Sequence, residues 1–420
     1  MNDNYTKLIV NPAPRLSGSI ELSGSKISAI VGLIISLIIK EKLVLTNFPK
    51  DLLDVRTCLE MIKNLGKNIH FDHKNKLTIS QNSSLSNEVT YNESSIRYTP
   101  LILASLIKNN QIVKVPLPGG CKIGKRGFDV YEYIFKKFGV TIYFEEGYII
   151  AETRKKIKVD KLKLQKVSTG GTFCALIMCS TIKGETFIEN AHIRPEVIDM
   201  INLLNKTGAK ISFNNNTIRV KGSESLIGAK HPLMNDIIEA FTYTIIGATN
   251  GKELKILDFP FASLKNEINL LKKTGAEIFV DDKDLIVSNN KILSFNLKTG
   301  PYPKIQSDLQ PIFASYALFA NGKSIISDNR FKNRYQYITE LSKLGASIIK
   351  RKNLIIITGN QKIVGASVRA LDIRCGASLI NSGMCAKGVT TILDAYQIKR
   401  GYENIDLKLN AVGGNVSFIQ

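Results

Sequence analysis

The sequence is poor in the residues that build metal centres and disulfide frameworks. It has no tryptophan, only four histidines, and no two cysteines spaced C-x-x-C. Because structural zinc sites need closely spaced Cys and His ligands, we expect no metal site. The six cysteines are scattered along the chain, at positions 58, 121, 174, 179, 375 and 385. This spacing is typical of reduced intracellular thiols and not of a disulfide-stabilised secreted domain.

Apolar segments long enough to cross a membrane are also missing. The one candidate, residues 27–39, lies between Lys26 and Lys40 and falls short of the roughly 20 residues that a spanning helix needs. The N-terminus has no apolar stretch behind a basic start, so no signal peptide is visible. We therefore expect a cytoplasmic protein without a membrane partner, with a buried helix over residues 27–39.

Acidic residues are outnumbered, since 36 Asp and Glu stand against 57 Lys and Arg, a net charge of +21. Such a positive charge favours anionic partners or solubility. Taken alone, it would also suggest a protein that binds nucleic acid. The sequence shows no basic patch interleaved with aromatic residues and no nucleic-acid reading module, so we expect no nucleic-acid partner. Only 13 of the cations are Arg, which makes each Arg a more specific sign of anion recognition than a Lys.

A short phrase recurs six times along the 420 residues, which are too many for one ordinary core. The phrase reads IKNLGKNI, FKKFGVTI, LNKTGAKI, LKKTGAEI, LSKLGASI and LNAVGGNV, with its glycine at positions 66, 139, 208, 275, 345 and 413. This pattern predicts the end of a helix, a glycine in the left-handed conformation, and then a β-strand. Upstream, each repeat carries a segment that is apolar on all sides and therefore predicts a buried helix: 29–39, 101–107, 172–182, 237–246, 311–319 and 377–385.

Six such units predict an α/β protein of two lobes with three repeats each. We expect one lobe over residues 25–234 and a second over residues 1–24 plus 235–420, with a strand at residues 7–10 that crosses to the second lobe. Ligands favour clefts between such lobes, so we expect the active site there.

Residues suited to anions stand at the starts of the buried helices. They are Ser25 and Lys26, Arg97, residues 168–171, residues 307–308 and residues 374–376. A helix start offers unpaired N–H groups and a partial positive charge, so it favours phosphate or carboxylate. A Gly-rich segment, PLPGGCKIGKRGFD at residues 116–129, adds Cys121 among three cations. A long loop of this kind is typical of function, and its charge is typical of a reactive thiol.

The stretches PLPGGCKIGKR, SGSK, ENAHIRPEVID, FKNRY, LDIR and IKRGYE carry a resemblance that runs nearly end to end. The sequence resembles the UDP-N-acetylglucosamine enolpyruvyl transferases (UDP-N-acetylglucosamine 1-carboxyvinyltransferases), which make a peptidoglycan precursor. The resemblance implies an inside-out α/β barrel of two lobes with three repeats each. It also implies transfer of the enolpyruvyl group of phosphoenolpyruvate to the 3-hydroxyl of UDP-N-acetylglucosamine by addition and elimination, with release of phosphate and without a cofactor.

The resemblance also implies roles for individual residues. Cys121 is the acid on a closing loop and the target of the epoxide fosfomycin, Asp308 is the base, and Lys26 is catalytic. Phosphoenolpyruvate is expected to contact Lys26, Ile27, Arg126 and Arg400. The acceptor is expected to contact Arg97, Arg126, Gly127, Phe128, Asp129, Val130, Lys166, Val167, Ser168, Thr169, Asp308 and Arg330. Arg334, Asp372 and Arg374 complete the expected cleft.

Several positions depart from the family pattern on the side of the sugar acceptor. Ile27 stands where the family has Asn, Arg194 where it has an acidic residue, Arg330 where it has an apolar one, and Gly127 where it has Pro. The stretch MNDIIE at residues 234–239 is a degraded form of another family motif. Two alternatives therefore stay open: the same transfer to a different nucleotide or phosphosugar, and a catalytically silent homologue.

Overall fold

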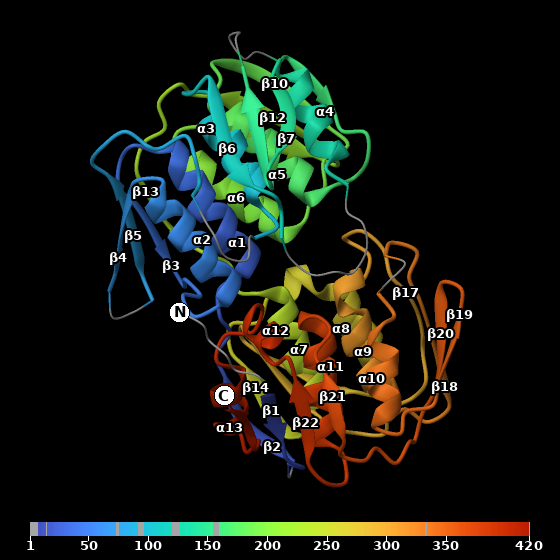
Figure 1. Ribbon diagram of the computed structural model, residues 1–420. Coiled ribbons are helices and arrows are strands. Elements are labelled where there is room, and N and C mark those ends of the chain that lie inside the picture. The colour runs from blue at the N-terminus through green and yellow to red at the C-terminus, as the bar shows by residue number, and fades with distance from the viewer. Residues whose placement is uncertain are drawn as a thin grey trace. The chain divides into compact units, whose positions relative to one another are not determined.

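The structure is a computed structural model that describes residues 7–13, 15–72, 75–90, 96–119, 127–153, 159–331 and 334–419 (Figure 1). The predicted acid Cys121 and the predicted ligand Arg126 lie outside the described residues. Contacts divide the chain into two units. We call residues 24–119 and 127–234 the N-terminal unit, and residues 7–23 and 235–419 the C-terminal unit.

The N-terminal unit alternates helices and strands. Its helices are α1 (Lys26–Ile35) with a 3-10 turn η1 (Ser36–Ile38), α2 (Leu53–Asn64), α3 (Thr99–Leu106), α4 (Asp129–Lys137), α5 (Thr169–Ser180) and α6 (Pro195–Lys206). Its strands are β3 (Leu43–Thr46), β4 (Lys67–Phe71), β5 (Leu77–Gln81), β6 (Ile112–Pro116), β7 (Thr141–Glu145), β8 (Tyr148–Glu152), β9 (Lys161–Lys163), β10 (Gly184–Glu189), β11 (Lys210–Asn214), β12 (Thr217–Gly222) and β13 (Ala229–Pro232). The strands form three sheets, ordered β13-β3-β5-β4, β6-β8-β7 and β11-β12-β10-β9.

The C-terminal unit repeats this plan. Its helices are α7 (Ile237–Asn250), η2 (Phe261–Ser263), α8 (Lys265–Lys273), η3 (Ser307–Leu309), α9 (Gln310–Ala317), α10 (Tyr337–Lys343), α11 (Ile373–Met384), α12 (Tyr396–Lys399) and α13 (Ile405–Asn410). Its strands are β1 (Lys7–Val10), β2 (Leu16–Ile20), β14 (Gly251–Ile256), β15 (Glu277–Asp281), β16 (Asp284–Ser288), β17 (Asn296–Lys298), β18 (Lys323–Ser327), β19 (Ile348–Arg351), β20 (Leu354–Thr358), β21 (Ser367–Arg369), β22 (Thr390–Leu393) and β23 (Val416–Ile419). Three sheets result, ordered β15-β16-β14-β2, β17-β18-β20-β19 and β21-β22-β1-β23.

Each four-stranded sheet joins one parallel pair to two antiparallel pairs. In the last sheet β21 lies parallel to β22, whereas β1 lies antiparallel to both β22 and β23. The strand predicted at residues 7–10 is therefore present and completes a sheet with strands from the other end of the sequence. Strand β2 likewise pairs with β14.

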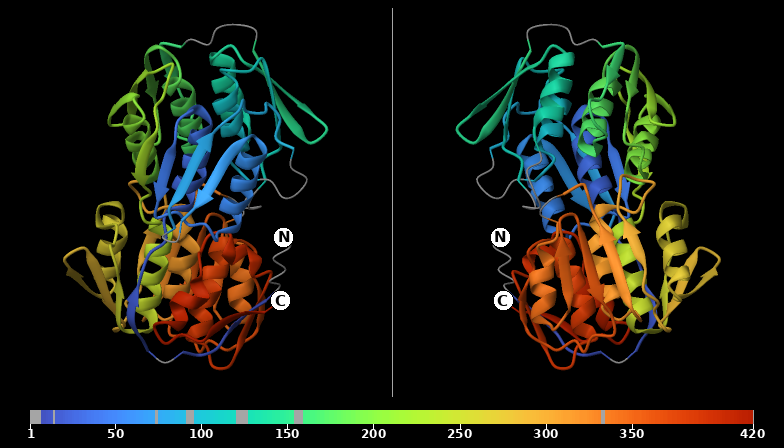
Figure 2. Two further views of the ribbon diagram at one scale, coloured as in Figure 1. Left: turned by 90° about the vertical axis from the view of Figure 1, so that its left-hand side faces the viewer. Right: turned by 90° about the vertical axis from the view of Figure 1, so that its right-hand side faces the viewer.

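The predicted apolar helices form the core of each unit. All residues of α3, α9 and α11 are buried, as are nearly all of α1, α5 and α7. In the C-terminal unit α7, α9 and α11 contact one another, and each packs against a sheet of its own repeat (Figures 1 and 2). In the N-terminal unit α3 contacts both α1 and α5. Both units are thus mixed α/β structures in which apolar helices are covered by sheets.

The six repeated glycines adopt the predicted conformation. Each has a positive φ, between 74° at Gly139 and 105° at Gly66, and each stands between the end of a helix and the next strand. At Gly139, Gly208 and Gly413 an added Cβ would meet no atom within 4 Å. The left-handed backbone, and not close packing, is therefore the reason for glycine at these three positions.

Candidate active site

Lys26 begins α1 and is held by a carboxylate. The backbone of Ser25 is extended, and its hydroxyl accepts the N–H of Ser28 at 3.3 Å, so the chain turns into the helix at this point. The Lys26 Nζ lies 3.1 Å from Asp54 Oδ2, and the two side chains are only 13% and 19% exposed. Asp54 thereby fixes the ammonium group at a helix start. The neighbouring Ile27 is half-buried and packs against the apolar core, so it offers no polar group to a ligand.

The start of α5 is organised by Ser168, Thr169 and a histidine. The Ser168 hydroxyl accepts the N–H of Gly171 at 3.2 Å. The Thr169 Oγ1 lies 2.9 Å from His192 Nδ1, and the backbone N–H of His192 donates to Thr172 Oγ1 at 2.9 Å. His192 is buried. Sequence reasoning missed it, because nothing in the motif ENAHIRPEVID indicates that its histidine reaches a helix start about twenty residues earlier.

The segments predicted to hold the acceptor meet at the starts of α4 and α5. Lys166 Nζ lies 2.5 Å from Asp129 Oδ2, and its hydrogen bond lowers the pKa of that carboxyl. A Cβ on Gly170 would lie 2.1 Å from the Tyr131 hydroxyl, and one on Gly171 would lie 2.6 Å from Val130. These glycines therefore allow α4 to approach α5 closely.

Of the other predicted acceptor residues of this unit, Gly127, Phe128 and Val167 adjoin these segments in the sequence, whereas Arg97 lies about thirty residues earlier. Phe128 packs its ring 5.5 Å from that of Tyr131 and 5.3 Å from that of Phe144. Gly127 and Val167 are exposed. Arg97 is half-buried in the turn that leads into α3. Helix α3 begins two residues later, at Thr99, with proline in its first turn.

In the C-terminal unit Asp308 is bound by a buried arginine. Arg334 Nη2 lies 2.5 Å from Asp308 Oδ1, and Arg334 Nε donates to the carbonyl of Ser307 at 3.2 Å. Arg334 Nη1 lies 3.9 Å from Asp372 Oδ2. The Arg334 side chain is 2% exposed, whereas that of Asp308 is 35% exposed. Asp308 is therefore an oriented carboxylate with an accessible face, the state that a general base requires.

Arg374 interacts with Asp308 and also with Tyr402 and Asp236. Burial acts to lower the pKa of its guanidinium, but Tyr402, Asp308 and Asp236 outweigh it and the pKa is raised. The guanidinium carbon lies 5.3 Å from the centre of the Tyr402 ring. Asp236, Asp308 and Arg374 stand at or just before the starts of α7, α9 and α11. Their charges interact, so these helix starts lie at one end of the unit.

The helix starts differ between the units in the charge of their caps. Asp372 accepts the N–H groups of Arg374 and Cys375 at 2.7 and 3.0 Å, and Asp236 accepts those of Ile238 and Glu239. The expectation that α11 offers these N–H groups to an anion is therefore wrong, because a carboxylate of the chain already binds them. The neutral caps of α1 and α5 leave more capacity for a bound anion.

Arg400 and Arg330, the remaining predicted arginines, contact partners of different kinds. Arg400 follows α12 and donates from Nη1 to Gln397 Oε1 at 2.8 Å. The backbone N–H of Arg330 donates to Asp328 Oδ1 at 2.7 Å, and its guanidinium lies 5.5 Å from the centre of the Phe331 ring.

Arg194, one of the departures from the family pattern, forms two 2.6 Å bonds to Glu196 and is buried with it. This pair balances the charge of Arg194, so the expectation of an added cation for the acceptor is not supported at this position.

Five thiols belong to the described part of the chain, and all are free. Burial raises the pKa of Cys58, Cys174, Cys179, Cys375 and Cys385. These groups are poor thiolates and poor nucleophiles.

Within the described ranges no cluster of three His, Cys, Asp or Glu side chains could hold a metal ion. No helix in those ranges combines the length and apolar character needed to cross a membrane.

The sequence profile of EPSP synthase (3-phosphoshikimate 1-carboxyvinyltransferase) matches residues 10–409. The chain belongs to this family. Relatives named UDP-N-acetylglucosamine 1-carboxyvinyltransferase include one from Rickettsia bellii, 34% identical over 98% of this chain and 99% of its own. Another, from Wolbachia pipientis of Culex pipiens, is 35% identical over 96% of each chain. The predicted resemblance to the UDP-N-acetylglucosamine 1-carboxyvinyltransferases is thus confirmed over nearly the whole chain.

Solved structures of the family share the fold. The enolpyruvyl transferase NikO from Streptomyces tendae covers 98% of this chain with a TM-score of 0.89 and 21% identity. EPSP synthase from Acinetobacter baumannii covers 99% with a TM-score of 0.77 and 16% identity. The predicted α/β class is therefore confirmed as that of the enolpyruvyl transferases.

Proposed function

We propose that this protein transfers the enolpyruvyl group of phosphoenolpyruvate to the 3-hydroxyl of UDP-N-acetylglucosamine. The observation that carries the proposal is the 34–35% identity, over almost the whole chain, to relatives named for this transfer. The anion-binding groups described above give it a chemical basis. As part of the proposal, the protein works in the cytoplasm on a peptidoglycan precursor, and its fold is an inside-out barrel of two lobes with three repeats each.

The proposed reaction is an addition followed by an elimination. The oxygen of the acceptor hydroxyl adds to C2 of phosphoenolpyruvate while C3 takes a proton from the thiol of Cys121, and Asp308 takes the hydroxyl proton. C3 then loses a proton to the Cys121 thiolate, the C2–oxygen bond to phosphate breaks, the double bond reforms, and the proton held by Asp308 leaves with the phosphate. The products are the enolpyruvyl ether and phosphate. The pair between Asp308 and Arg334 supports the role of Asp308, since it orients the carboxylate.

Cationic groups supply the binding that this reaction requires. Lys26, Arg126 and Arg400 are proposed for the phosphate and carboxylate of phosphoenolpyruvate, and Arg374 with Arg97 for further negative charge. For the nucleotide we propose residues 126–130 and 166–169, two segments joined by the Lys166–Asp129 ion pair. The proposal requires that both units present these groups to the same pair of substrates.

The test is release of phosphate from phosphoenolpyruvate in the presence of UDP-N-acetylglucosamine, with mass spectrometry of the product. We expect a product heavier than the acceptor by one enolpyruvyl group, and we expect Cys121→Ala to stop turnover while the circular dichroism of the fold is unchanged. The activity of the Ala variant would contradict the role of Cys121. An absence of product from the wild-type protein would contradict the proposed acceptor.

A second candidate keeps the reaction and changes the acceptor. It is favoured by Ile27, whose side chain packs on the core where the family pattern has a polar Asn, and by Arg330, which brings a cation where the pattern is apolar. The same assay with a panel of uridine nucleotides and phosphosugars decides between the two. Turnover with another nucleotide, without turnover of UDP-N-acetylglucosamine, would select the second candidate, and no turnover with any acceptor would select a silent homologue.

A further inference from the structure

Asp328 differs in structure from the residues at the same place in four other repeats. Asn47, Asn190, Asp258 and Asp394 stand one or two residues beyond β3, β10, β14 and β22, and each has a positive φ between 50° and 59°. Asp328 follows β18 in the same way, but its φ is not positive. It is also the only one of the five that is buried, at 3% exposed. The side chain of Asp328 thus lies inside the C-terminal unit.

The Asp328 carboxylate joins two segments of this unit. The Ser307 hydroxyl donates a hydrogen bond to Oδ2 of Asp328, and both residues are at most 4% exposed. The backbone N–H of Arg330 donates to Oδ1 at 2.7 Å. Hydrogen bonds to a buried carboxylate are stronger than those between neutral groups in water. One side chain therefore links the start of η3 to the segment that follows β18.

Asp328 is itself fixed by the neighbouring strand. Its backbone N–H lies 2.9 Å from the carbonyl oxygen of Asn353 and 2.8 Å from the hydroxyl oxygen of Tyr335. The Tyr335 hydroxyl in turn donates to the same carbonyl of Asn353. Asn353 stands directly before β20, which pairs with β18. Because the sheet holds Asp328 in place, its carboxylate can fix the segments that it binds.

Ser307 begins η3 and directly precedes the proposed base, Asp308. This 3-10 helix is only three residues long, and among the described residues no side chain caps its start. Such a short helix has little stability of its own, so its direction depends on tertiary contacts. Arg334 supplies one such contact, since its guanidinium binds the Ser307 carbonyl and the Asp308 carboxylate. The bond from the Ser307 hydroxyl to Asp328 supplies a second.

We propose that Asp328 is a positioning residue for the transfer reaction. Through Ser307 it sets the direction of the Asp308 carboxylate, and through the backbone of Arg330 it sets the place of a side chain expected at the acceptor. The inference rests on the proposed function and adds to it a residue that acts through its neighbours. A displacement of about 1 Å can lower a rate about a hundredfold. Loss of the Ser307 bond should therefore lower kcat, and loss of the Arg330 bond should raise the KM for the acceptor.

The first test removes the Ser307 bond alone. Ser307→Ala deletes the hydroxyl and leaves the bond between Arg330 and Asp328. We expect kcat for phosphate release to fall about ten- to a hundredfold, while the KM for UDP-N-acetylglucosamine changes by less than about threefold. Ser307→Thr keeps a hydroxyl and should have a kcat within about threefold of wild type. Wild-type kcat in Ser307→Ala, or an equal loss in Ser307→Thr, would overturn the proposal.

The second test removes both bonds and includes a measurement that needs no turnover. In Asp328→Ala the Arg330 amide loses its acceptor, so its hydrogen exchange, measured by mass spectrometry of peptides, should be at least about tenfold faster than in wild type. Ser307→Ala should leave this exchange unchanged. In the kinetic assay Asp328→Ala should lower kcat as Ser307→Ala does, and should also raise the KM for the acceptor about three- to tenfold. Unchanged exchange in folded Asp328→Ala would refute the link between Asp328 and Arg330.

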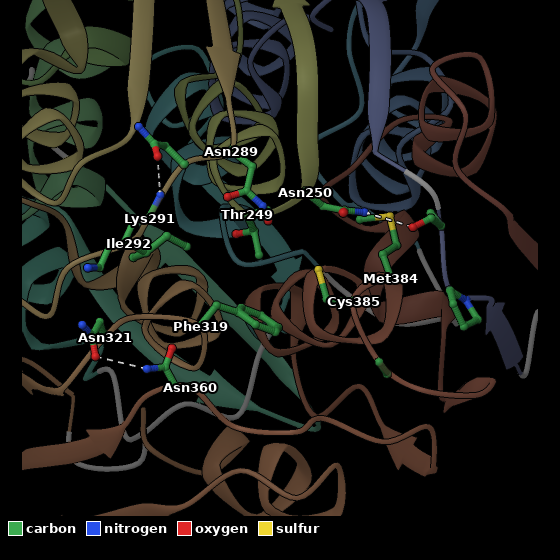
Figure 3. Close-up of a pocket in the computed structure, with 14 residues that line it drawn as sticks. Thr249, Asn250, Asn289, Lys291, Ile292, Phe319, Asn321, Asn360, Met384 and Cys385 are labelled. Atoms are coloured by element: carbon green, nitrogen blue, oxygen red, sulfur yellow. Dashed lines mark hydrogen bonds between the residues drawn. The ribbon is translucent and has the colours of Figure 1, made fainter.

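A matched control comes from the other end of α7. Thr249 lies in the last turn of this helix, in the lining of a pocket of about 560 Å³ (Figure 3). Its buried hydroxyl donates to the carbonyl of Ile245 at 2.7 Å. Thr249→Val removes a buried hydroxyl bond, as Ser307→Ala does, and should leave kcat within about twofold of wild type. Circular dichroism checks that each variant is folded.

The proposed function and the positioning role fail in different ways. An absence of product from the wild-type protein would contradict the proposed function, and the exchange at Arg330 would still decide whether Asp328 holds this segment. Wild-type turnover that Ser307→Ala leaves unchanged would contradict the positioning role alone.

Discussion

Glu267 offers the sharpest prediction about stability, because its carboxyl is buried and has no basic partner among the residues that the structure describes. It is the third residue of α8 and is 2% exposed. Burial raises its pKa from 4.5 to about 7, although a backbone hydrogen bond acts in the opposite direction. Its place in the first turn of a helix also favours the charged form. Desolvation is therefore the stronger effect, and within the described residues no Lys or Arg forms an ion pair with this carboxylate.

The magnitude follows from the difference between the two pKa values. The folded chain holds the proton more tightly than the unfolded chain, so stability is highest below the unfolded pKa of 4.5 and decreases as pH rises toward 7. A shift of about 2.5 pKa units corresponds to about 3 kcal/mol. Glu267→Gln has the same shape and does not titrate. We expect it to be up to about 3 kcal/mol more stable than wild type at pH 8, and equally stable near pH 4.5.

The assay is unfolding by urea and by heat at both pH values, followed by circular dichroism because the chain has no tryptophan. In a unit of this size the effect corresponds to roughly 6–12 °C in Tm at pH 8. Glu253→Gln, at an exposed position of β14, is the matched control and should show no pH-dependent gain. If Glu267→Gln followed the wild-type pH dependence, burial would not be the dominant influence on this carboxyl.

Three further predictions concern the proposed active site. Fosfomycin should modify Cys121 alone, because burial raises the pKa of the five described thiols. Peptide mass spectrometry checks this. An adduct at Cys385, the least buried of the five, would contradict the prediction. Asp308→Asn should lower kcat by about 10²–10⁴-fold in a protein that circular dichroism shows to be folded, and a variant with normal kcat would exclude Asp308 as the base. Lys166→Gln should raise the KM for the nucleotide sugar about three- to tenfold and leave the KM for phosphoenolpyruvate unchanged, and a change in both KM values would argue against a local role at the Asp129 pair.

The parts of the fold that local chemistry dictates could be predicted from the sequence. A glycine with positive φ after each helix, and a helix apolar on all sides in each repeat, are properties of short segments. The strand at residues 7–10 was predictable as a strand, and its pairing with β22 and β23 agrees with the expected crossing to the second half.

The side-chain partners within the candidate site could not be predicted in this way. Lys26 meets Asp54, Thr169 meets His192, and Asp308 meets Arg334 at separations of 28, 23 and 26 residues. Each pair depends on how one repeat folds back on itself, which no local pattern records. The caps are an instructive exception. Asp372 stands directly before its helix and is a visible N-cap signal, whereas Arg374, two residues later, is a cation that equally suggests a substrate anion.

Strands β1 and β2 also set the order in which the protein can be completed during synthesis. Residues 7–20 are synthesised before their partners: β2 has no partner until β14 is made, and β1 has none until β22 and β23 are made. The N-terminal unit, residues 24–119 and 127–234, is made between these strands and can fold meanwhile. A change within residues 7–20 therefore affects sheets that are completed late. It destabilises the C-terminal unit, although most of that unit is encoded more than 200 residues downstream.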